Sequence, residues 1–208
     1  MNLLILGPKD RNINIIDFLK KQGNNVYLTE NEINLEFLKY NNIDFLISNG
    51  YASIIKKELI DKYNKKIINI HPTYLPYGRG IYPLVWALLE NSPIGVSIHF
   101  IDYEIDAGDI ILRKKVNLDE ELTLQEAYFI LLREANKLFI DNWTNILNGN
   151  FQCIKQTLLQ PYRSRNISEK YISIFYNLWN TKLKRVKKMH KLYKNNQIFV
   201  NFIKEKYD

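Results

Sequence analysis

The stretch KIINIHPTYLPYGRGIYPLVW, residues Lys66–Trp86, joins a short apolar run to a long irregular loop. The opening KIINI has the length and composition of a buried strand. Prolines and glycines then interrupt the chain until Pro83, near the first turn of a helix predicted over Pro83–Leu89. Asn69 and His71 lie two residues apart at the strand end, so their side chains point to the same side of the sheet. The stretch therefore predicts a strand that presents an amide and an imidazole together.

Upstream of this stretch, short apolar runs alternate with helical patterns. Strands are predicted over Asn2–Leu6, Asn25–Leu28, Asp44–Ser48 and Lys66–Ile70, and helices over Asn12–Lys21, Leu35–Tyr40 and Ile54–Tyr63. Downstream, strands are predicted over Gly95–Ile101 and Asp109–Val116, and helices over Thr123–Leu147 and Ser168–Tyr193. This order predicts an α/β, Rossmann-like fold with a mostly parallel twisted sheet flanked by helices. We expect a catalytic domain over residues 1–149 and a small basic C-terminal extension over 150–208.

The positive charge is concentrated in the C-terminal quarter of the chain. The 208 residues carry a net charge of +7, and residues 151–208 hold 13 Lys and Arg against 3 Asp and Glu. Seven of these cations lie in KLKRVKKMHKLYK, residues Lys182–Lys194. We interpret this run as a solvated face or a subunit contact, in preference to a surface for nucleic acid or anionic membrane.

Several classes of protein are excluded by what the sequence lacks. One cysteine, Cys153, excludes a disulfide framework, and the three histidines lack the spacing of a zinc site, so no metal is expected. The apolar run at the N-terminus is too short for a signal peptide, and no run in the chain reaches the ~20 apolar residues of a membrane span. We expect a soluble, cytoplasmic protein. The first strand-to-helix turn, GPKDRN, lacks the glycine spacing of a dinucleotide site, and no phosphate-binding P-loop is present.

Three loops follow predicted strands where an α/β sheet binds its ligands: residues 48–53, 69–80 and 102–109. The second loop begins with Asn69 and His71, and the third, DYEIDAGD, offers four carboxylates. An amide and a cationic imidazole can donate hydrogen bonds to an oxyanion, while a carboxylate holds the imidazole and helps move a proton. No serine or cysteine nucleophile motif is present, so direct transfer of an acyl group to an amine is the simplest chemistry.

The motifs Asn69-Ile70-His71-Pro72, Tyr74-Leu75-Pro76, Gly80, Ser97-Ile98-His99-Phe100 and Ile105-Asp106-Ala107-Gly108-Asp109-Ile110 occur in that order. Over roughly residues 1–147 the chain resembles the folate-dependent formyltransferases. The resemblance implies 10-formyltetrahydrofolate as formyl donor and assigns the catalytic roles to Asn69, His71 and Asp106. The same resemblance implies that folate lies against Asn49, Gly50, Tyr51, Ser53, Ile55, Tyr103, Glu104 and Ile105, with His99 near the folate or a water that carries the proton.

The loop from Arg79 to Trp86 most resembles the nucleotide-sugar N-formyltransferases, which modify dTDP- or GDP-linked amino sugars for O-antigen, lipopolysaccharide and other surface polysaccharide. This subgroup implies a homodimer and acceptor contacts from Lys9, Arg11, Tyr77, Arg79, Gly80 and Trp86. Glycinamide ribonucleotide and methionyl-tRNA remain alternative acceptors. A nucleic-acid-binding module on a degenerate formyltransferase core is the alternative outside enzymes.

Overall fold

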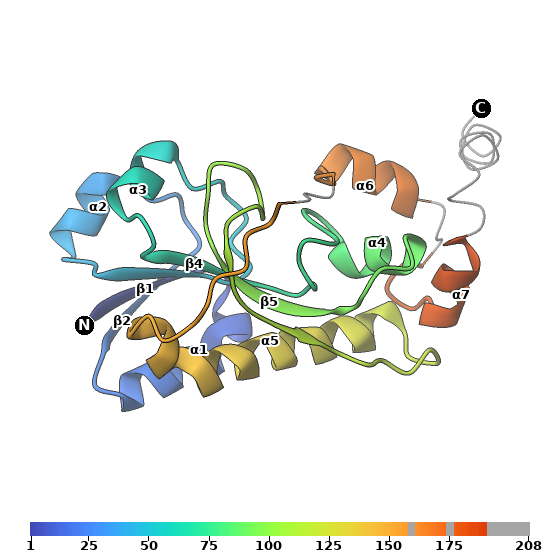
Figure 1. Ribbon diagram of the computed structural model, residues 1–208, viewed down its shortest axis with the longest axis horizontal. Coiled ribbons are helices and arrows are strands. Elements are labelled where there is room, and N and C mark those ends of the chain that lie inside the picture. Colours follow the sequence, from blue (N-terminus) through green and yellow to red (C-terminus); the bar gives the residue numbers. More distant parts are fainter. Residues whose placement is uncertain (158–160, 174–176, 191–208) are drawn as a thin grey trace.

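A computed structural model describes residues 1–157, 161–173 and 177–190. In chain order its elements are β1 (Asn2–Leu6), α1 (Lys9–Lys21), β2 (Asn25–Thr29), α2 (Leu35–Tyr40), β3 (Phe45–Ser48), α3 (Lys57–Lys62), β4 (Ile67–His71), α4 (Pro83–Leu89), β5 (Gly95–Phe100), β6 (Ile110–Lys115), α5 (Leu124–Leu147), α6 (Arg165–Ile172) and α7 (Leu183–Lys188). Helices α1 and α5 cover one face of the sheet and α2 and α3 the other, while α4, α6 and α7 gather at one end (Figure 1). The predicted α/β architecture is confirmed.

The six strands form one mixed sheet in the order β2-β1-β3-β4-β5-β6. The pairs among β2, β1, β3 and β4 are parallel, and β5 pairs antiparallel with both β4 and β6. Five strands therefore run in one direction, and β5 runs against them. The register pairs Ser48 with Asn69 and Asn69 with His99, so these side chains lie in one row across the sheet.

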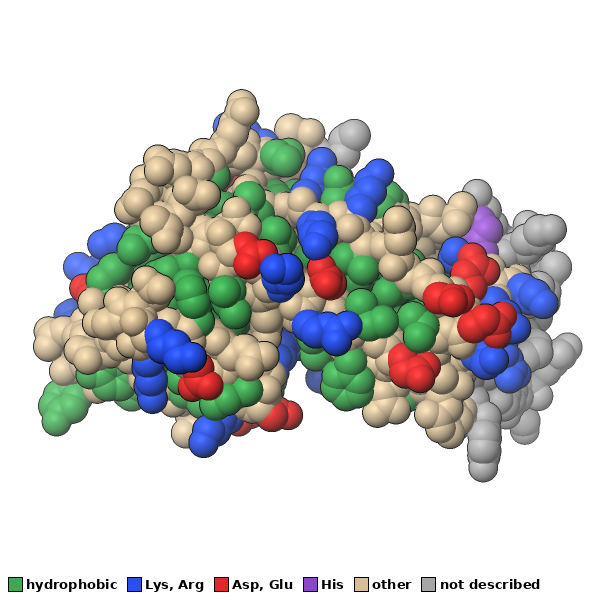
Figure 2. Space-filling view, turned by 90° about the horizontal axis from the view of Figure 1, so that it is seen from below, with side chains coloured by type: hydrophobic (Ala, Val, Ile, Leu, Met, Phe, Trp, Pro, Cys, Tyr) green, Lys and Arg blue, Asp and Glu red, His purple; other side chains and the backbone are tan. Residues whose placement is uncertain are grey.

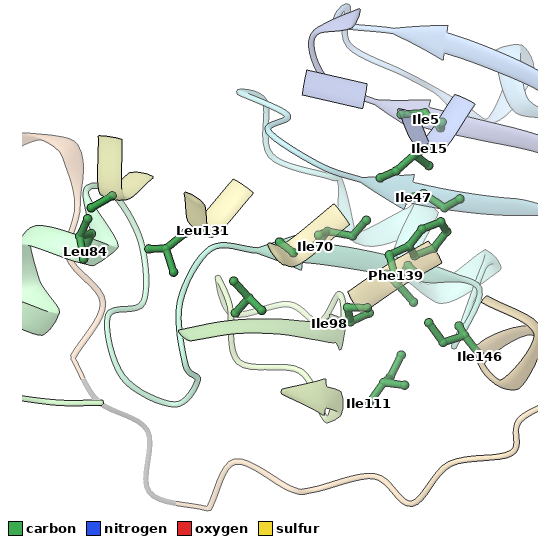
Figure 3. Close-up of a cluster of buried hydrophobic side chains, with 14 of the residues drawn as sticks. Ile5, Ile15, Ile47, Ile70, Leu84, Ile98, Ile111, Leu131, Phe139 and Ile146 are labelled. Carbon is green, nitrogen blue, oxygen red and sulfur yellow. The ribbon is translucent and has the colours of Figure 1, made fainter. Parts of the chain in front are cut away.

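Alternation along the parallel strands divides the core between two layers. Leu3 and Ile5 of β1 face the α1 and α5 side, while Leu4 and Leu6 face the α2 and α3 side. The larger layer continues through Ile47, Ile70 and Ile98 on successive strands and packs against Phe139 of α5 (Figure 3). A sheet buried on both faces holds the strand ends, and the loops that follow them, in fixed positions.

The C-terminal segment differs from the single helix predicted over Ser168–Tyr193. The described part forms two short helices, α6 and α7, and residues 174–176 and 191–193 lie outside the described residues. Between the helices, the carbonyls of Trp179 and Thr181 accept hydrogen bonds from the N–H groups of Gln125 and Leu124 at the start of α5. Helical backbone would direct these carbonyls along its own axis, so the contact with α5 excludes a continuous helix.

Two helices of the N-terminal half begin elsewhere than predicted. Helix α1 starts at Lys9 rather than Asn12, because its polar first turn carries no apolar periodicity for a pattern to detect. Helix α3 covers only Lys57–Lys62 of the predicted Ile54–Tyr63.

Three lysines in the described part of the basic C-terminal segment form ion pairs. Lys182 and Lys184 form ion pairs with Glu121, and Lys187 pairs with Glu120. Acidic and basic side chains lie intermingled at this end of the molecule, beside the grey residues (Figure 2). Among the described residues, no helix is both long and apolar enough to cross a bilayer.

Candidate active site

Asn69, His71 and Asp106 meet at a cleft of about 630 Å³ beyond the end of β4. Asn69 and His71 lie on β4, and Asp106 lies in the loop between β5 and β6. Asn69 Nδ2 is 3.4 Å from Asp106 Oδ1, and His71 Nε2 is 3.5 Å from Asp106 Oδ2. One carboxylate thus faces both the amide and the imidazole, as the sequence predicted for an acyl-transfer site.

The backbone around Asp106 is held from several directions. Asp106 itself has a φ of +53°, a left-handed conformation that is unfavourable for a residue with a side chain. The Gly80 N–H donates to Asp106 Oδ2 at 2.9 Å, and Gln156 Nε2 donates to the carbonyls of Asp106 at 3.1 Å and Gly108 at 2.7 Å. These hydrogen bonds keep the carboxylate aimed at β4.

Asp106 is ionised despite its burial. Burial opposes the charge, but the His71 and His99 imidazoles, the Gly80 N–H and the Arg79 guanidinium outweigh it and lower the pKa of Asp106. The anionic carboxylate lies 3.5 Å from His71 Nε2, within range of a direct charge interaction.

His99 is a neutral partner of this group. Its side chain is 2% exposed, and burial lowers its pKa to about 4. Nδ1 lies 2.8 Å from the Phe100 carbonyl, which can only accept, so Nδ1 carries the proton and Nε2 has a free lone pair. Asn69 Nδ2 lies 3.1 Å from that Nε2 and must therefore donate to it. His99 thereby fixes which way the Asn69 amide points.

Most of the predicted folate-contacting residues line the cleft. These are Gly50, Tyr51, Ser53, Ile55, His99, Tyr103, Glu104 and Ile105. Asn49 is the exception, since it is fully buried and its side chain bonds Asn12, Asn136 and Arg11 instead. Asn49 therefore joins α1, β3 and α5 beneath the cleft.

Of the predicted acceptor-contacting residues, only Arg11 and Gly80 line the cleft. Arg79 is 4% exposed and donates to the Ile105 carbonyl from both Nε and Nη2, at 3.0 and 2.6 Å. Trp86 is 1% exposed and donates from Nε1 to Ser168 Oγ. Lys9 and Tyr77 are also absent from the lining. The structure thus places Arg79 in support of the loop before Asp106 and Trp86 in the packing of α4 against α6.

The cleft also contains residues that sequence reasoning missed. Tyr82, Tyr128, Tyr162, Arg165 and Trp179 all line it. Three of these, Tyr162, Arg165 and Trp179, come from the C-terminal segment, which is predicted as an extension apart from the catalytic domain and so gives no reason to place a side chain at the site. Among the described residues, no group of three or more His, Cys, Asp and Glu side chains could hold a metal ion.

Comparison with known proteins identifies the family. The family model described as formyl transferase matches residues 7–142. The chain is 33% identical to PseJ from Anoxybacillus kamchatkensis, solved in complex with UDP-4,6-dideoxy-4-formamido-L-AltNAc and tetrahydrofolate, with a TM-score of 0.83 over 89% of this chain and 97% of PseJ. It is 25% identical to the methionyl-tRNA formyltransferase of Clostridium thermocellum, with a TM-score of 0.66 over 86% of this chain and 78% of that one.

Curated relatives give the same family. The methionyl-tRNA formyltransferase of Finegoldia magna is 36% identical over 88 residues, which are 42% of this chain and 28% of the relative. The chain spans less than half the length of the methionyl-tRNA formyltransferases that it matches most significantly. The family model covers more than half of the chain and includes all three residues that meet at the cleft. The chain belongs to the formyl transferase family.

Proposed function

We propose that this protein transfers a formyl group from 10-formyltetrahydrofolate to the amine of a nucleotide-linked amino sugar. The observation that carries this proposal is the convergence of Asn69, His71 and Asp106 on one cleft in a member of the formyl transferase family. An amide, an imidazole and an ionised carboxylate are sufficient for transfer of an acyl group to an amine without a covalent enzyme intermediate.

In this mechanism the uncharged amine of the acceptor attacks the formyl carbon. Negative charge develops on the formyl oxygen, and Asn69 Nδ2 and the protonated imidazole of His71 donate hydrogen bonds to it. Asp106 holds the proton on His71 and, through a water, accepts the proton that the attacking nitrogen releases. The bond between the formyl carbon and the folate nitrogen then breaks, and that nitrogen takes up the proton that Asp106 accepted. The products are the formamide and tetrahydrofolate.

The residues of the cleft fit a flat, partly apolar donor. Ile54, Ile55, Ile101 and Ile105 form apolar walls, and the loop backbone between them offers polar groups. We place the pterin between the loop after β3 and the loop that leads to Asp106, next to Asn69 and His71.

The sugar acceptor is supported by PseJ, which this chain matches over 97% of the PseJ length. PseJ was solved with a UDP-linked 4-formamido sugar, so a UDP-linked 4-amino sugar is the first acceptor to test, before dTDP- and GDP-linked sugars. Methionyl-tRNA is favoured less, because the chain spans 28% of the length of the Finegoldia magna relative and matches the Clostridium thermocellum structure with a TM-score of 0.66 against 0.83 for PseJ.

The cellular setting follows from the acceptor. We propose that the product serves surface-polysaccharide synthesis in the cytoplasm, including O-antigen and lipopolysaccharide.

We further propose that the protein acts as a homodimer through residues 150–208. Light scattering during gel filtration tests the dimer, and a monomer at micromolar concentration would contradict it.

The acceptor is tested by incubating the protein with 10-formyltetrahydrofolate and UDP-, dTDP- and GDP-linked amino sugars. Mass spectrometry would detect a sugar that has gained one formyl group, and an Asp106→Asn variant serves as the control for uncatalysed formylation. Glycinamide ribonucleotide and methionyl-tRNA are included as competitors. Formylation of either competitor without any sugar product would overturn the sugar acceptor and leave the formyl transfer standing.

A further inference from the structure

Three aromatic side chains form one continuous wall of the cleft. Trp179 lies between Tyr128 and Tyr82, with ring centroids 5.5 Å and 6.2 Å apart and interplanar angles of 50° and 47°. All three line the cleft, and Trp179 is 40% exposed. We call Tyr82, Tyr128 and Trp179 the aromatic wall. The proposed mechanism and the proposed folate contacts use none of its members.

The aromatic wall is built before any ligand arrives. The first N–H groups of α5, which have no partner within the helix, donate to the carbonyls of Thr181 and Trp179 at 2.9 and 3.0 Å. These bonds fix the backbone of Trp179 against the first turn of α5. Tyr128 lies about one turn further along that helix. Tyr82 stands at the N-cap of α4 with a φ of +56°, which is unfavourable for a residue other than glycine. An exposed indole held this rigidly loses little conformational freedom when a flat ligand stacks on it.

A cation stands at one end of the aromatic wall. Arg11 Nη1 lies 3.2 Å from the Tyr128 hydroxyl, and Arg11 Nε donates to Asn49 Oδ1 at 2.7 Å. Within the part of the chain that the structure describes, no carboxylate forms an ion pair with Arg11. Burial lowers the pKa of Arg11, although the Tyr128 hydroxyl and the nearby Asp10 carboxylate partly oppose this effect.

Arg11 is also close to the catalytic residues. A β-carbon placed on Gly50, two residues after the end of β3, would be 2.8 Å from Arg11 Cδ and 3.0 Å from Arg11 Nη1, so the guanidinium packs against the loop that follows β3. The neighbouring strand β4 carries Asn69 and His71, and neighbouring strands are about 4.8 Å apart. An anion on Arg11 would therefore lie in the same cleft as Asn69, His71 and Asp106.

We propose that the nucleobase of the acceptor stacks on the aromatic wall, chiefly on Trp179, and that its phosphates bind Arg11. This proposal rests on the proposed function and names the residues that recognise the nucleotide part of the acceptor. Every base presents a π-face that stacks on aromatic side chains, and a guanidinium matches the oxygens of a phosphate. A nucleoside diphosphate carries both features on one molecule, whereas the residues assigned to the pterin do not include Tyr82, Tyr128, Trp179 or Arg11.

The tryptophans of the chain provide a direct signal for this site. Of the three tryptophans, Trp86 and Trp143 are 1% and 3% exposed, so Trp179 is the one that a ligand in the cleft can reach. UDP without any sugar is the probe, with uridine as its counterpart that lacks phosphate. We expect UDP to quench the fluorescence of the wild-type protein and Trp179→Phe to abolish this quenching.

Affinities from titration calorimetry separate the two contacts. Trp179→Ala is expected to weaken UDP and uridine alike, by about tenfold to a hundredfold, because it removes the stacking surface. Arg11→Gln is expected to remove most of the preference for UDP over uridine, because only UDP has phosphates. Phe129→Ala is the matched control, since Phe129 follows Tyr128 on α5, is 59% exposed and does not line the cleft. Tetrahydrofolate binding should be unchanged in all three variants.

Three other outcomes of these measurements would overturn the proposal. Equal UDP affinity in wild type and Trp179→Ala would overturn the proposal while the sugar acceptor stands. Loss of tetrahydrofolate binding in Trp179→Ala would assign the wall to the folate and would also overturn it. If UDP, dTDP and GDP all fail to bind the wild-type protein, the nucleotide-sugar acceptor falls and this proposal falls with it.

Discussion

Acidification should destabilise the fold through His99, which the structure holds neutral at the centre of the site. Burial lowers the pKa of His99 from 6.5 to about 4. Below pH 6.5 the unfolded chain binds a proton at this residue, whereas the folded protein does not until about pH 4. The stabilisation is therefore complete above about pH 6.5 and is lost progressively as the pH falls toward 4.

The two pKa values set the size of the effect. Between pH 8 and pH 5 the difference in proton binding removes about 2 kcal/mol of unfolding free energy, and by about pH 3 the loss approaches about 3 kcal/mol. Such a loss is a large share of the roughly 5–15 kcal/mol that stabilises a typical domain. The lowered pKa of Asp106 acts in the same direction, but only below its ordinary value of 3.8. The interval from pH 8 to pH 5 therefore separates the effect of His99 from that of Asp106.

Urea denaturation at a series of pH values measures this loss. The His99→Gln variant lacks the titrating group. Between pH 8 and pH 5 the unfolding free energy of the wild type should therefore fall by about 2 kcal/mol more than that of the variant. His190→Gln is the matched control, because His190 is a half-buried histidine that contacts the Leu89 carbonyl and does not line the cleft. Parallel pH profiles for the wild type and His99→Gln would refute the reasoning, because His99 would then be protonated or solvated in the folded state.

Three substitutions test how the carboxylate is held and used. Asp106→Asn should lower kcat by about 100-fold to 10,000-fold with unchanged tetrahydrofolate binding, and near-normal turnover in steady-state assays would refute its role in proton transfer. Gln156→Ala removes the donor to two carbonyls, so the unfolding free energy measured in urea should fall by about 1–3 kcal/mol and kcat should also fall. A loss of stability with normal kcat would limit Gln156 to a structural role. Gly108→Ala should lower the melting temperature, because its β-carbon would lie 1.9 Å from the Phe100 carbonyl oxygen, and an unchanged melting temperature would show that the loop can move aside.

The sequence predicted the first 147 residues well because their local signals agree with the tertiary structure. The strand over Asn2–Leu6 matches its prediction residue for residue, and Thr123 and Glu126 form the predicted capping box of α5. The region after Leu147 was predicted less well. Its apolar periodicity is typical of a long helix. In the structure, however, the first N–H groups of α5 donate hydrogen bonds to the Trp179 and Thr181 carbonyls, and no local sequence pattern predicts such a contact.

The catalytic residues were predictable and most of their supports were not. Asn69 and His71 share a side of β4 by strand alternation, and a motif identifies Asp106. The sequence assigns Arg79 to the acceptor because a nucleoside diphosphate needs cationic partners, yet its side chain turns inward to the Ile105 carbonyl. Gln156 reaches Asp106 across 50 positions of sequence. Such long-range hydrogen bonds depend on where the chain returns, which composition and periodicity do not encode.

The contacts made by Ile154, Gln156 and Arg163 restrict how this protein can be divided. Ile154 pairs with Ile110 beside the catalytic loop, Gln156 holds the Asp106 carbonyl, and Arg163 exchanges backbone hydrogen bonds with the loop around Gly80. A cut at residue 149 would therefore leave all three catalytic side chains in one fragment and remove part of the scaffold that aims them. Chimaeras that aim to exchange acceptor specificity would do better to keep residues 1–165 as one unit. Only the chain beyond that point, which carries Trp179, would then be replaced.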